Sequence, residues 1–331
     1  MTQARPLVTA LAQAATTATC APSVHNTQPW RWRVLPDRLE LFAVRDRQLK
    51  AIDPDGWLMT LSCGIALHHA RVALAAEGWS VRVHRMPDPA RPDLLATLTG
   101  AEEIAAPAEA MRLVQCMRVR RTDRRPVSDE AVPQPTLDAI VAAAEAEGIH
   151  LQPLRPEQVL ELAAVASRAA AVEADDPEIR AELEYWTGPA APPGTGLTSE
   201  VLPEKPTRTT VPGRDFVTFG TLPIGPGHDR AAVYALLFGG DDELVSWLRA
   251  GEALSAAWLV ATEFGVGVLP LSAVVEDLGA RQVLRQMIAT LGYPYLVLRL
   301  GIPDPAHAGP PHTPRLPARD VVDTSAVRAH R

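Results

Sequence analysis

The chain has 331 residues, of which 47% are hydrophobic, so it can bury one large core or two of ordinary size. Its formal net charge of −7 argues against a general nucleic-acid binder, because such proteins need positive charge to meet phosphates. Three cysteines without a Cys-x-x-Cys spacing indicate a reducing compartment and do not support a zinc site.

The N-terminal stretch carries one arginine, Arg5, and then an alanine-rich run that reaches Cys20. A signal peptide is one interpretation of such a pattern. The run also contains Gln13 and four threonines, which make it only weakly apolar, so we interpret residues 5–20 as an amphipathic helix. We find no run of roughly 18 apolar residues, the length needed to span a bilayer, and expect a cytoplasmic protein with no membrane partner.

A proline-containing polar loop follows at residues 21–30, with the sequence Ala-Pro-Ser-Val-His-Asn-Thr-Gln-Pro-Trp. Pro22 and Pro29 favour extended backbone before them, so the loop is stiff and non-helical. Such a loop suits recognition of a flat, hydrogen-bonding heterocycle. It also fits an ordinary helix-to-strand connection, which generic expectation slightly favours. The side chains that can form hydrogen bonds are Ser23, His25, Asn26, Thr27 and Gln28.

The remainder of the first third predicts a hairpin and a long helix. Residues 31–35 and 38–44 alternate apolar and polar side chains around a Pro-Asp turn, as hairpin strands do. Turn residues at 53–56 precede a helix that starts at Trp57 and ends at Gly78. This helix is apolar around most of its circumference, so we expect it to be central and buried. Strands are predicted at 80–86 and 93–99, and a helix at 107–119.

An arginine cluster follows that helix. Arginine binds phosphate monoesters through charge-assisted, bidentate hydrogen bonds, and Thr122 adds a hydroxyl donor. A solvated basic face or a nucleic-acid patch are the alternatives. We favour a specific anion site, because the protein is acidic and Asp123 lies inside the cluster. The cluster consists of Arg118, Arg120, Arg121, Arg124 and Arg125.

The middle of the chain combines predicted helices with one long irregular stretch. Helices are predicted at 136–147 and over most of 156–186, with a break near residues 175–177. Residues 187–215 are rich in Pro, Gly and Thr and have no period. A loop of this length is either functional or disordered, and we interpret it as a lid. Further along, we predict strands or extended segments at 216–222 and 232–238. We also predict strands at 266–269 and 294–300, a second long helix ending at Phe264, and a helix at 276–290.

The other candidate ligands do not form a site in the sequence. His68 and His69 lie on the first long helix, where a core or interface role is favoured. His307 and His312 lie in a tail from Pro303 that shows no core pattern, and they lack carboxylate partners. The sequence therefore predicts no metal site.

The two long helices overlay at a constant offset of 187 residues. Asp55 falls on Asp242, and Gly64 falls on Gly251. A glycine inside a helix costs roughly 1 kcal/mol relative to alanine, so the matched glycines predict close packing of one helix on the other. Chance similarity between two alanine-rich helices is the alternative, and we favour an internal duplication.

The loop at 21–30 resembles the flavin-binding loop of the nitroreductase family, and its full form resembles that of the two-domain, Acg-type branch. Nitroreductases are typically intertwined α+β homodimers with FMN at the subunit interface. The resemblance implies an α+β fold duplicated in one chain as a pseudo-dimer, with two mixed β-sheets flanked by helices and one long central helix in each half. The first half would be 1–115, with the flavin-ring loop. The second would be 116–331, with the phosphate site and a lid-like loop at 187–215.

The resemblance also implies which residues bind FMN. Residues 120–124 are similar to the family's phosphate segment, with Thr in place of Ser, and Arg315 best matches its C-terminal basic residue. Asn26 and Gln28 would bond the pyrimidine edge of the ring, and residues 268–270 resemble the apolar segment at the ring face. The full implied set is Pro22, Ser23, His25, Asn26, Gln28, Arg120, Arg121, Thr122, Arg124, Leu269, Pro270 and Arg315.

The sequence lacks a second set of FMN-binding residues, in which the two halves would exchange their roles. No paired arginines precede the first helix, and no Asn-x-Gln-Pro follows the helix at 136–147, so we predict one FMN per chain. The resemblance implies that NAD(P)H reduces the flavin and that a nitroaromatic or quinone-like acceptor reoxidises it, without a catalytic side chain. The alternative is an FMN-holding protein with a lid-shielded flavin and little turnover. The fused chain would be a monomeric pseudo-dimer or a further homodimer.

Overall fold

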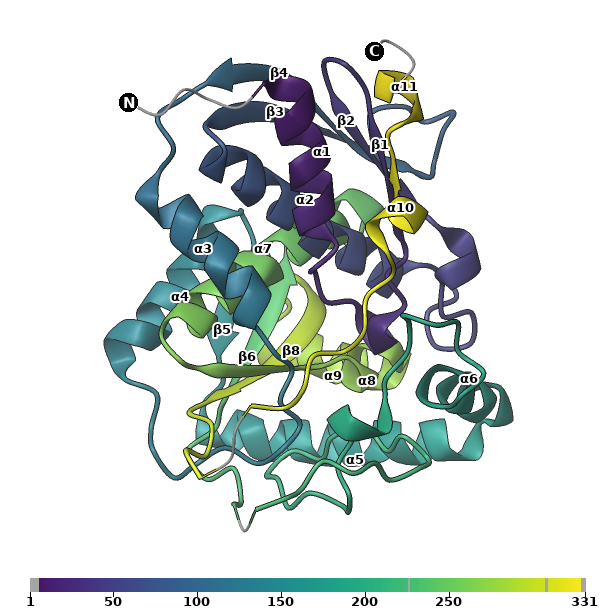
Figure 1. The fold of residues 1–331 in the computed structure, drawn as a ribbon. Coiled ribbons are helices and arrows are strands. Elements are labelled where there is room, and N and C mark those ends of the chain that lie inside the picture. Colours follow the sequence, from purple (N-terminus) through teal and green to yellow (C-terminus); the bar gives the residue numbers. More distant parts are fainter. Residues whose placement is uncertain (1–5, 226, 307–308, 329–331) are drawn as a thin grey trace.

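The computed structural model describes residues 6–225, 227–306 and 309–328, which form two β-sheets with helices between and around them (Figure 1). The chain is therefore an α+β protein, as predicted. The first sheet has the order β3-β4-β2-β1-β9 and the second the order β5-β6-β8-β7. The strands are β1 Trp30–Val34, β2 Leu39–Ala43, β3 Trp79–Arg85, β4 Leu94–Glu103, β5 His150–Pro153, β6 Val233–Gly239, β7 Gly267–Leu271, β8 Tyr293–Gly301 and β9 Val322–Asp323.

The first sheet is mixed because the C-terminal tail returns to it. Strand β1 alternates buried and exposed residues and pairs antiparallel with β2, which confirms the predicted hairpin. Strand β9 then pairs parallel with β1, with Trp32 opposite Val322. The tail was expected to lack a core pattern, yet Val321 and Val322 are buried. Two buried residues are too short a signal to mark a strand in the sequence.

The predicted break after the long middle helix is confirmed. Helix α5, Pro156–Asp175, ends where α6, Pro177–Thr187, begins. The Asp176 carboxylate accepts hydrogen bonds from the backbone N–H groups of Glu178 and Ile179, as an N-cap does. The other helices outside the centre are α1 Leu7–Ala18, α3 Ala108–Val119, α4 Gln134–Ala146, α8 Ala273–Glu276, α9 Leu278–Met287, α10 Ala318–Val321 and α11 Ser325–Arg328, with 3₁₀ turns at Val24–Asn26, Arg45–Arg47 and Ser199–Val201.

Two predicted elements differ from the structure. Residues 216–222 form no strand, and Leu222 makes only an isolated bridge with Pro203. The helix expected at 276–290 is split, because Asp277 caps a new helix by accepting from the N–H of Ala280. Strands β5 and β9 were not predicted, since both are too short to show a period.

The two long helices are α2, Trp57–Ala76, and α7, Leu244–Glu263, and they cross at the centre of the molecule (Figure 1). A Cβ atom added at Gly64 would lie 2.9 Å from the Cα of Gly251 and would overlap the carbonyl oxygen of Leu248. A Cβ added at Gly251 would likewise overlap the carbonyl oxygen of Leu61. The close packing predicted from the matched glycines is therefore confirmed.

Helix α2 differs from the expectation that no segment is long and apolar enough to span a bilayer. Among the described residues, it is the one helix long and apolar enough to cross a membrane by length and composition alone. However, 83% of its apolar window is buried inside the protein. Burial of this extent is what a core helix shows.

The two sheets repeat one topology. Read from the far edge, β3-β4-β2-β1 and β7-β8-β6-β5 follow the same order, and all these neighbours pair antiparallel. The β2–β4 register shifts between Leu41 and Phe42, and the β6–β8 register shifts between Leu237 and Phe238. The second sheet has no parallel pair among its named strands, and its parallel element is an isolated bridge between Thr122 and Val268.

Candidate functional site

The polar loop between α1 and β1 holds an unusual backbone. His25, Asn26 and Gln28 have φ values of 48°, 57° and 50°, in the left-handed region that non-glycine residues rarely adopt. The N–H of Gln28 donates to Ser23 Oγ at 2.8 Å, and the N–H of Val24 donates to the Ser62 hydroxyl of α2 at 3.3 Å. Strained backbone that its surroundings hold in place is a feature of ligand sites.

A cavity of about 1050 Å³, counting the part that opens to solvent, lies between this loop, α2, α7 and β7. Small-molecule sites typically measure about 300–1,000 Å³ and have mostly apolar walls. The α7 side chain of Trp258 lies on one wall, and Leu269 and Pro270 of β7 lie on another. Thr122 and Arg124 supply polar groups. The walls of the cavity therefore come from both predicted halves of the chain.

A second, smaller pocket of about 430 Å³ adjoins the cavity. Four residues line both, namely Pro22, Ser23, Thr122 and Arg124. Among the predicted residues, Asn26, Arg120 and Arg121 line only the smaller pocket. His25, Leu269 and Pro270 line only the larger one. The structure thus brings ten of the twelve predicted site residues to two joined pockets and leaves out Gln28 and Arg315.

The described residues that line the smaller pocket include three arginines and no carboxylate. The side chain of Arg120 is buried, with its guanidinium 4.5 Å from the Trp258 ring centroid, and its Nε and one terminal nitrogen find no hydrogen-bond partner among the described residues. Burial, helped by the charge of Arg315, lowers the pKa of Arg120 to about 9. Burial lowers the pKa of Arg124 to about 10. Because Asp123 pairs with Arg125 at 2.7 Å, the pocket is suited to an anion.

Asn26 and Gln28 hold protein segments in place. Gln28 Nε2 donates to the carbonyl of Gly194 at 2.7 Å, and its Oε1 accepts from the N–H of Leu316 at 2.9 Å. Asn26 Nδ2 donates to the carbonyl of Gly196 at 3.0 Å, and its Oδ1 accepts from Arg315. These amides therefore fasten the loop to residues 194–196 and to the tail, and this use could not be read from the sequence.

No protein-family model matches the chain. Two Mycobacterium tuberculosis (strain ATCC 25618 / H37Rv) proteins are similar to nearly all of it. The one provisionally named NAD(P)H nitroreductase Rv3131 is 38% identical over 313 residues, which cover 93% of this chain and 89% of that protein. The one provisionally named NAD(P)H nitroreductase acg is 32% identical over 315 residues, 94% of each chain.

The chain belongs to the nitroreductase family. Its similarity to acg agrees with the branch that residues 21–30 predict. Among solved structures, nitroreductase A from Vibrio parahaemolyticus RIMD 2210633 matches at 14% identity and a TM-score of 0.40, over 66% of this chain and 82% of that chain. The family assignment rests on the sequence relatives.

In this nitroreductase-family chain, part of the 187–215 stretch and Phe216 beside it line the cavity. Arg214 pairs with Glu276 of α8 and lies 3.7 Å from Glu173 of α5, and its guanidinium also reaches His25 Nε2 at 3.3 Å. Phe216 packs edge-on against His25 at 5.9 Å. Burial, with the charges of Arg214 and Arg124, holds the pKa of His25 well below its usual range, so His25 is neutral. Sequence reasoning missed Arg214, since the 187–215 stretch has no period, and it assigned Phe216 to a strand instead of the cavity wall.

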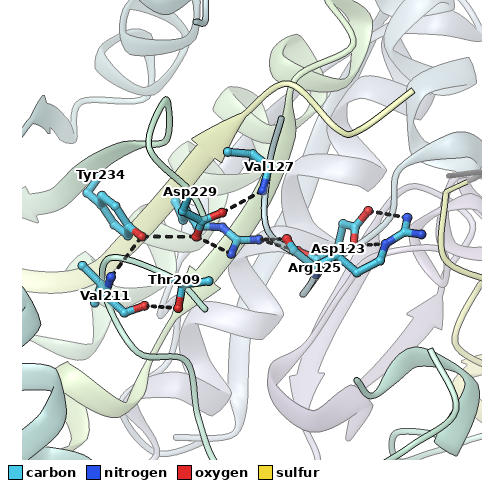
Figure 2. Close-up of polar contacts among 8 residues, drawn as sticks. Asp123, Arg125, Val127, Thr209, Val211, Asp229 and Tyr234 are labelled. Atoms are coloured by element: carbon cyan, nitrogen blue, oxygen red, sulfur yellow. Dashed lines mark hydrogen bonds and ion pairs between the residues drawn. The ribbon is translucent and has the colours of Figure 1, made fainter. Parts of the chain in front are cut away.

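A buried ion pair fixes the backbone of the arginine segment. Asp229 and Arg299 pair at 2.8 Å, and both are almost fully buried. Arg299 donates to the carbonyls of Asp123 and Arg125 at 2.9 and 2.7 Å, and Asp229 accepts from the N–H of Val127 at 2.7 Å (Figure 2). An arginine within the apolar strand 294–300 was the one sequence signal for this network.

The same network reaches the stretch that lines the cavity. The Tyr234 hydroxyl donates to Asp229 at 3.4 Å and accepts from the N–H of Val211 at 3.3 Å (Figure 2). Thr209 Oγ1 donates to the carbonyl of Val211 at 2.8 Å. Thr209 and Val211 line the cavity. One buried carboxylate therefore connects the arginine segment to the cavity wall.

Proposed function

We propose that this nitroreductase-family protein binds one FMN and acts as an NAD(P)H-dependent oxidoreductase on nitroaromatic or quinone-like acceptors. The observation that carries the proposal is the buried guanidinium of Arg120, with two nitrogens lacking a partner, in the smaller of two joined pockets. A phosphate monoester carries about −1.5 to −2 charges and would supply the missing acceptors. The names of the sequence relatives support the choice of NAD(P)H.

The residues fit FMN along its length. Arg120, Arg121, Thr122 and Arg124 would hold the phosphate, which would offset the cost of burying their charges. The apolar wall that includes Leu269 would face the ring. When bound, FMN accepts and donates hydride equivalents, and the chain's own residues bind it, orient it and exclude water. Since residues of both predicted halves line the cavity, a single chain can form a complete FMN site.

An anaerobic absorbance titration with NADPH and then NADH tests the proposal. A flavin spectrum at one FMN per chain that bleaches promptly supports it. A colourless protein that takes up no added FMN overturns it. The same flavin spectrum, bleached by dithionite and by neither nucleotide, supports instead a flavin-holding protein with little turnover.

This second candidate is favoured by the position of Arg214. Its pairing with Glu276 and its approach to Glu173 hold the neighbouring stretch against His25, over the space where a nicotinamide or acceptor would stack. If this stretch shields the flavin, Arg214→Gln raises the rate of NAD(P)H oxidation severalfold, while the exposed control Arg208→Gln leaves it unchanged. Equal rates in both variants contradict shielding.

A further inference from the structure

Matched positions of the two long helices contact each other. Gly64 and Gly251 are in close contact, and His68 Nδ1 lies 2.8 Å from the hydroxyl of Ser255, which is 187 positions further along. In a two-fold arrangement, equivalent residues meet each other only near the axis. With the repeated strand order and register shift, these contacts define an internal two-fold axis between α2 and α7.

The 187-residue relation can be applied to the cavity. Ile65 and Trp258 line it from α2 and α7, and Ser272 lines it at the end of β7. Their counterparts are all charged and they meet at one place. The positions and their counterparts are Ile65 and Glu252, Trp258 and Arg71, and Ser272 and Arg85.

These counterparts form a cluster of ion pairs. Glu252 is 0% exposed, and its two carboxylate oxygens accept from Arg71 at 2.7 Å and from Arg85 at 2.6 Å. Arg71 also donates to Glu147 at 2.6 Å. Burial acts to raise the pKa of Glu147, but the hydrogen bond and charge of Arg71 outweigh it and lower that pKa. The cluster thus holds two positive and two negative charges.

The neighbouring histidine adds no charge. His68 Nε2 lies 3.8 Å from Glu147, yet burial outweighs the effect of this carboxylate and lowers the pKa of His68 to about 4. Each ion pair of the cluster joins a residue of 1–115 to a residue of 116–331. The cluster is therefore electrically neutral and spans the contact between the two halves.

The cluster also lies where the polar loop has no counterpart. Residues 19–29 separate α1 from β1, whereas only residues 147–149 separate the corresponding α4 from β5. Glu147 is the first residue after α4 and turns toward α2, where it meets Arg71. The shortened connection thus supplies one of the four charges in place of a binding loop.

We propose that the cluster of Arg71, Arg85, Glu147 and Glu252 fills the second, symmetry-related copy of the cofactor cavity and fastens the two halves there. The inference rests on the proposed function for the identity of the cavity's ligand. It assigns the chain one cofactor site, and it gives the second position a structural role.

The test combines cofactor stoichiometry with stability. We expect one FMN per chain in the wild type, in Glu252→Gln and in Arg85→Met, with FMN dissociation constants within about twofold of each other. Both variants should unfold at temperatures several degrees lower, because Glu252→Gln leaves Arg85 without its partner and Arg85→Met leaves the buried Glu252 with Arg71 alone. The matched control Arg82→Met, at an exposed position of the same strand, should keep the wild-type midpoint.

Two results overturn the inference. One is a second FMN bound to the wild type or to either variant. The other is an unchanged unfolding midpoint in Arg85→Met. The Arg85 side chain is 20% exposed against 0% for that of Glu252, so this variant keeps the test usable if Glu252→Gln does not fold. A chain that binds no FMN overturns the proposed function instead, and the unfolding midpoints still decide whether the cluster fastens the halves.

Discussion

The cofactor cavity and the ion-pair cluster occupy matched positions on one pair of crossed helices, but they treat buried charge differently. In the smaller pocket beside the cavity, Arg120 is buried with no carboxylate partner among the described residues, whereas in the cluster Glu252 is fully buried between two arginines. A buried charge needs a partner, from the chain or from a ligand. On the same backbone scaffold, the balance of buried charge therefore separates a binding region from a structural one.

The largest expected effect is on the helix crossing that supports both regions. Gly64→Ala places a Cβ against the backbone of α7, which cannot move without displacing the helix. We expect a loss of about 3 kcal/mol or more in the free energy of unfolding, or no folded protein. Chemical denaturation measures it. Gly240→Ala, where nothing lies within 4 Å of the added atom, should be nearly neutral, and equal effects of both changes would contradict the close crossing.

The Arg120→Met variant tests the smaller pocket, which Arg120 lines. It should weaken FMN binding on the order of 100-fold, because at least two charge-assisted hydrogen bonds of about 1.5–3 kcal/mol each are lost. Without FMN the variant should be no less stable than the wild type, since an unpaired buried charge has been removed. Flavin fluorescence titrations and thermal unfolding measure the two effects.

Riboflavin sharpens this test, because it lacks the phosphate. Its affinity should be similar in the wild type and in Arg120→Met, and the exposed control Arg118→Met should bind FMN normally. If riboflavin and FMN lose affinity equally, Arg120 does not serve the phosphate.

The pH dependence of the free energy of unfolding should report on His68, beside the ion-pair cluster. The pKa of His68 is about 4 in the folded protein, below its ordinary value of 6.5, so between these values the unfolded chain binds a proton that the folded protein excludes. Stability should therefore fall as the pH decreases from 6.5 toward 4, by up to about 3 kcal/mol. Urea unfolding at several pH values should show a shallower dependence in His68→Gln, and an unaltered one in the exposed control His84→Gln. An identical dependence in all three proteins would speak against a neutral, buried His68.

The smallest effect is expected at Thr122, which lines both pockets. Thr122→Val removes one neutral hydrogen-bonding group and should weaken FMN binding about fivefold, corresponding to about 1 kcal/mol. Isothermal titration calorimetry can resolve this change. The exposed Thr221→Val should leave the affinity unaltered, and a loss at Thr122 as large as that at Arg120 would mean that the two residues act as one unit.

Local patterns predicted the scaffold, and long-range contacts decided the site. The period of α2 and the matched glycines are local features, so the helices and their crossing could be predicted. The extended backbone expected before Pro29 is wrong, because Gln28 has a φ of 50°. The long-range partners of Asn26 and Gln28 could not be predicted, because they lie more than 160 positions away and, apart from the Arg315 side chain, are backbone groups. The same holds for Arg214, which looks like any polar residue of an irregular stretch.

The returning tail has a consequence for biosynthesis. Strand β9 completes the first sheet beside β1, and residues 314–316 hydrogen-bond to the polar loop. A ribosome makes the loop long before these partners, at about 5–20 residues per second, so the loop lacks its contacts with the tail until residues 314–316 have been made. Cofactor uptake should therefore wait until residues 314–316 have been made, and a truncated product that stops before residue 314 should fold much of its scaffold and remain colourless.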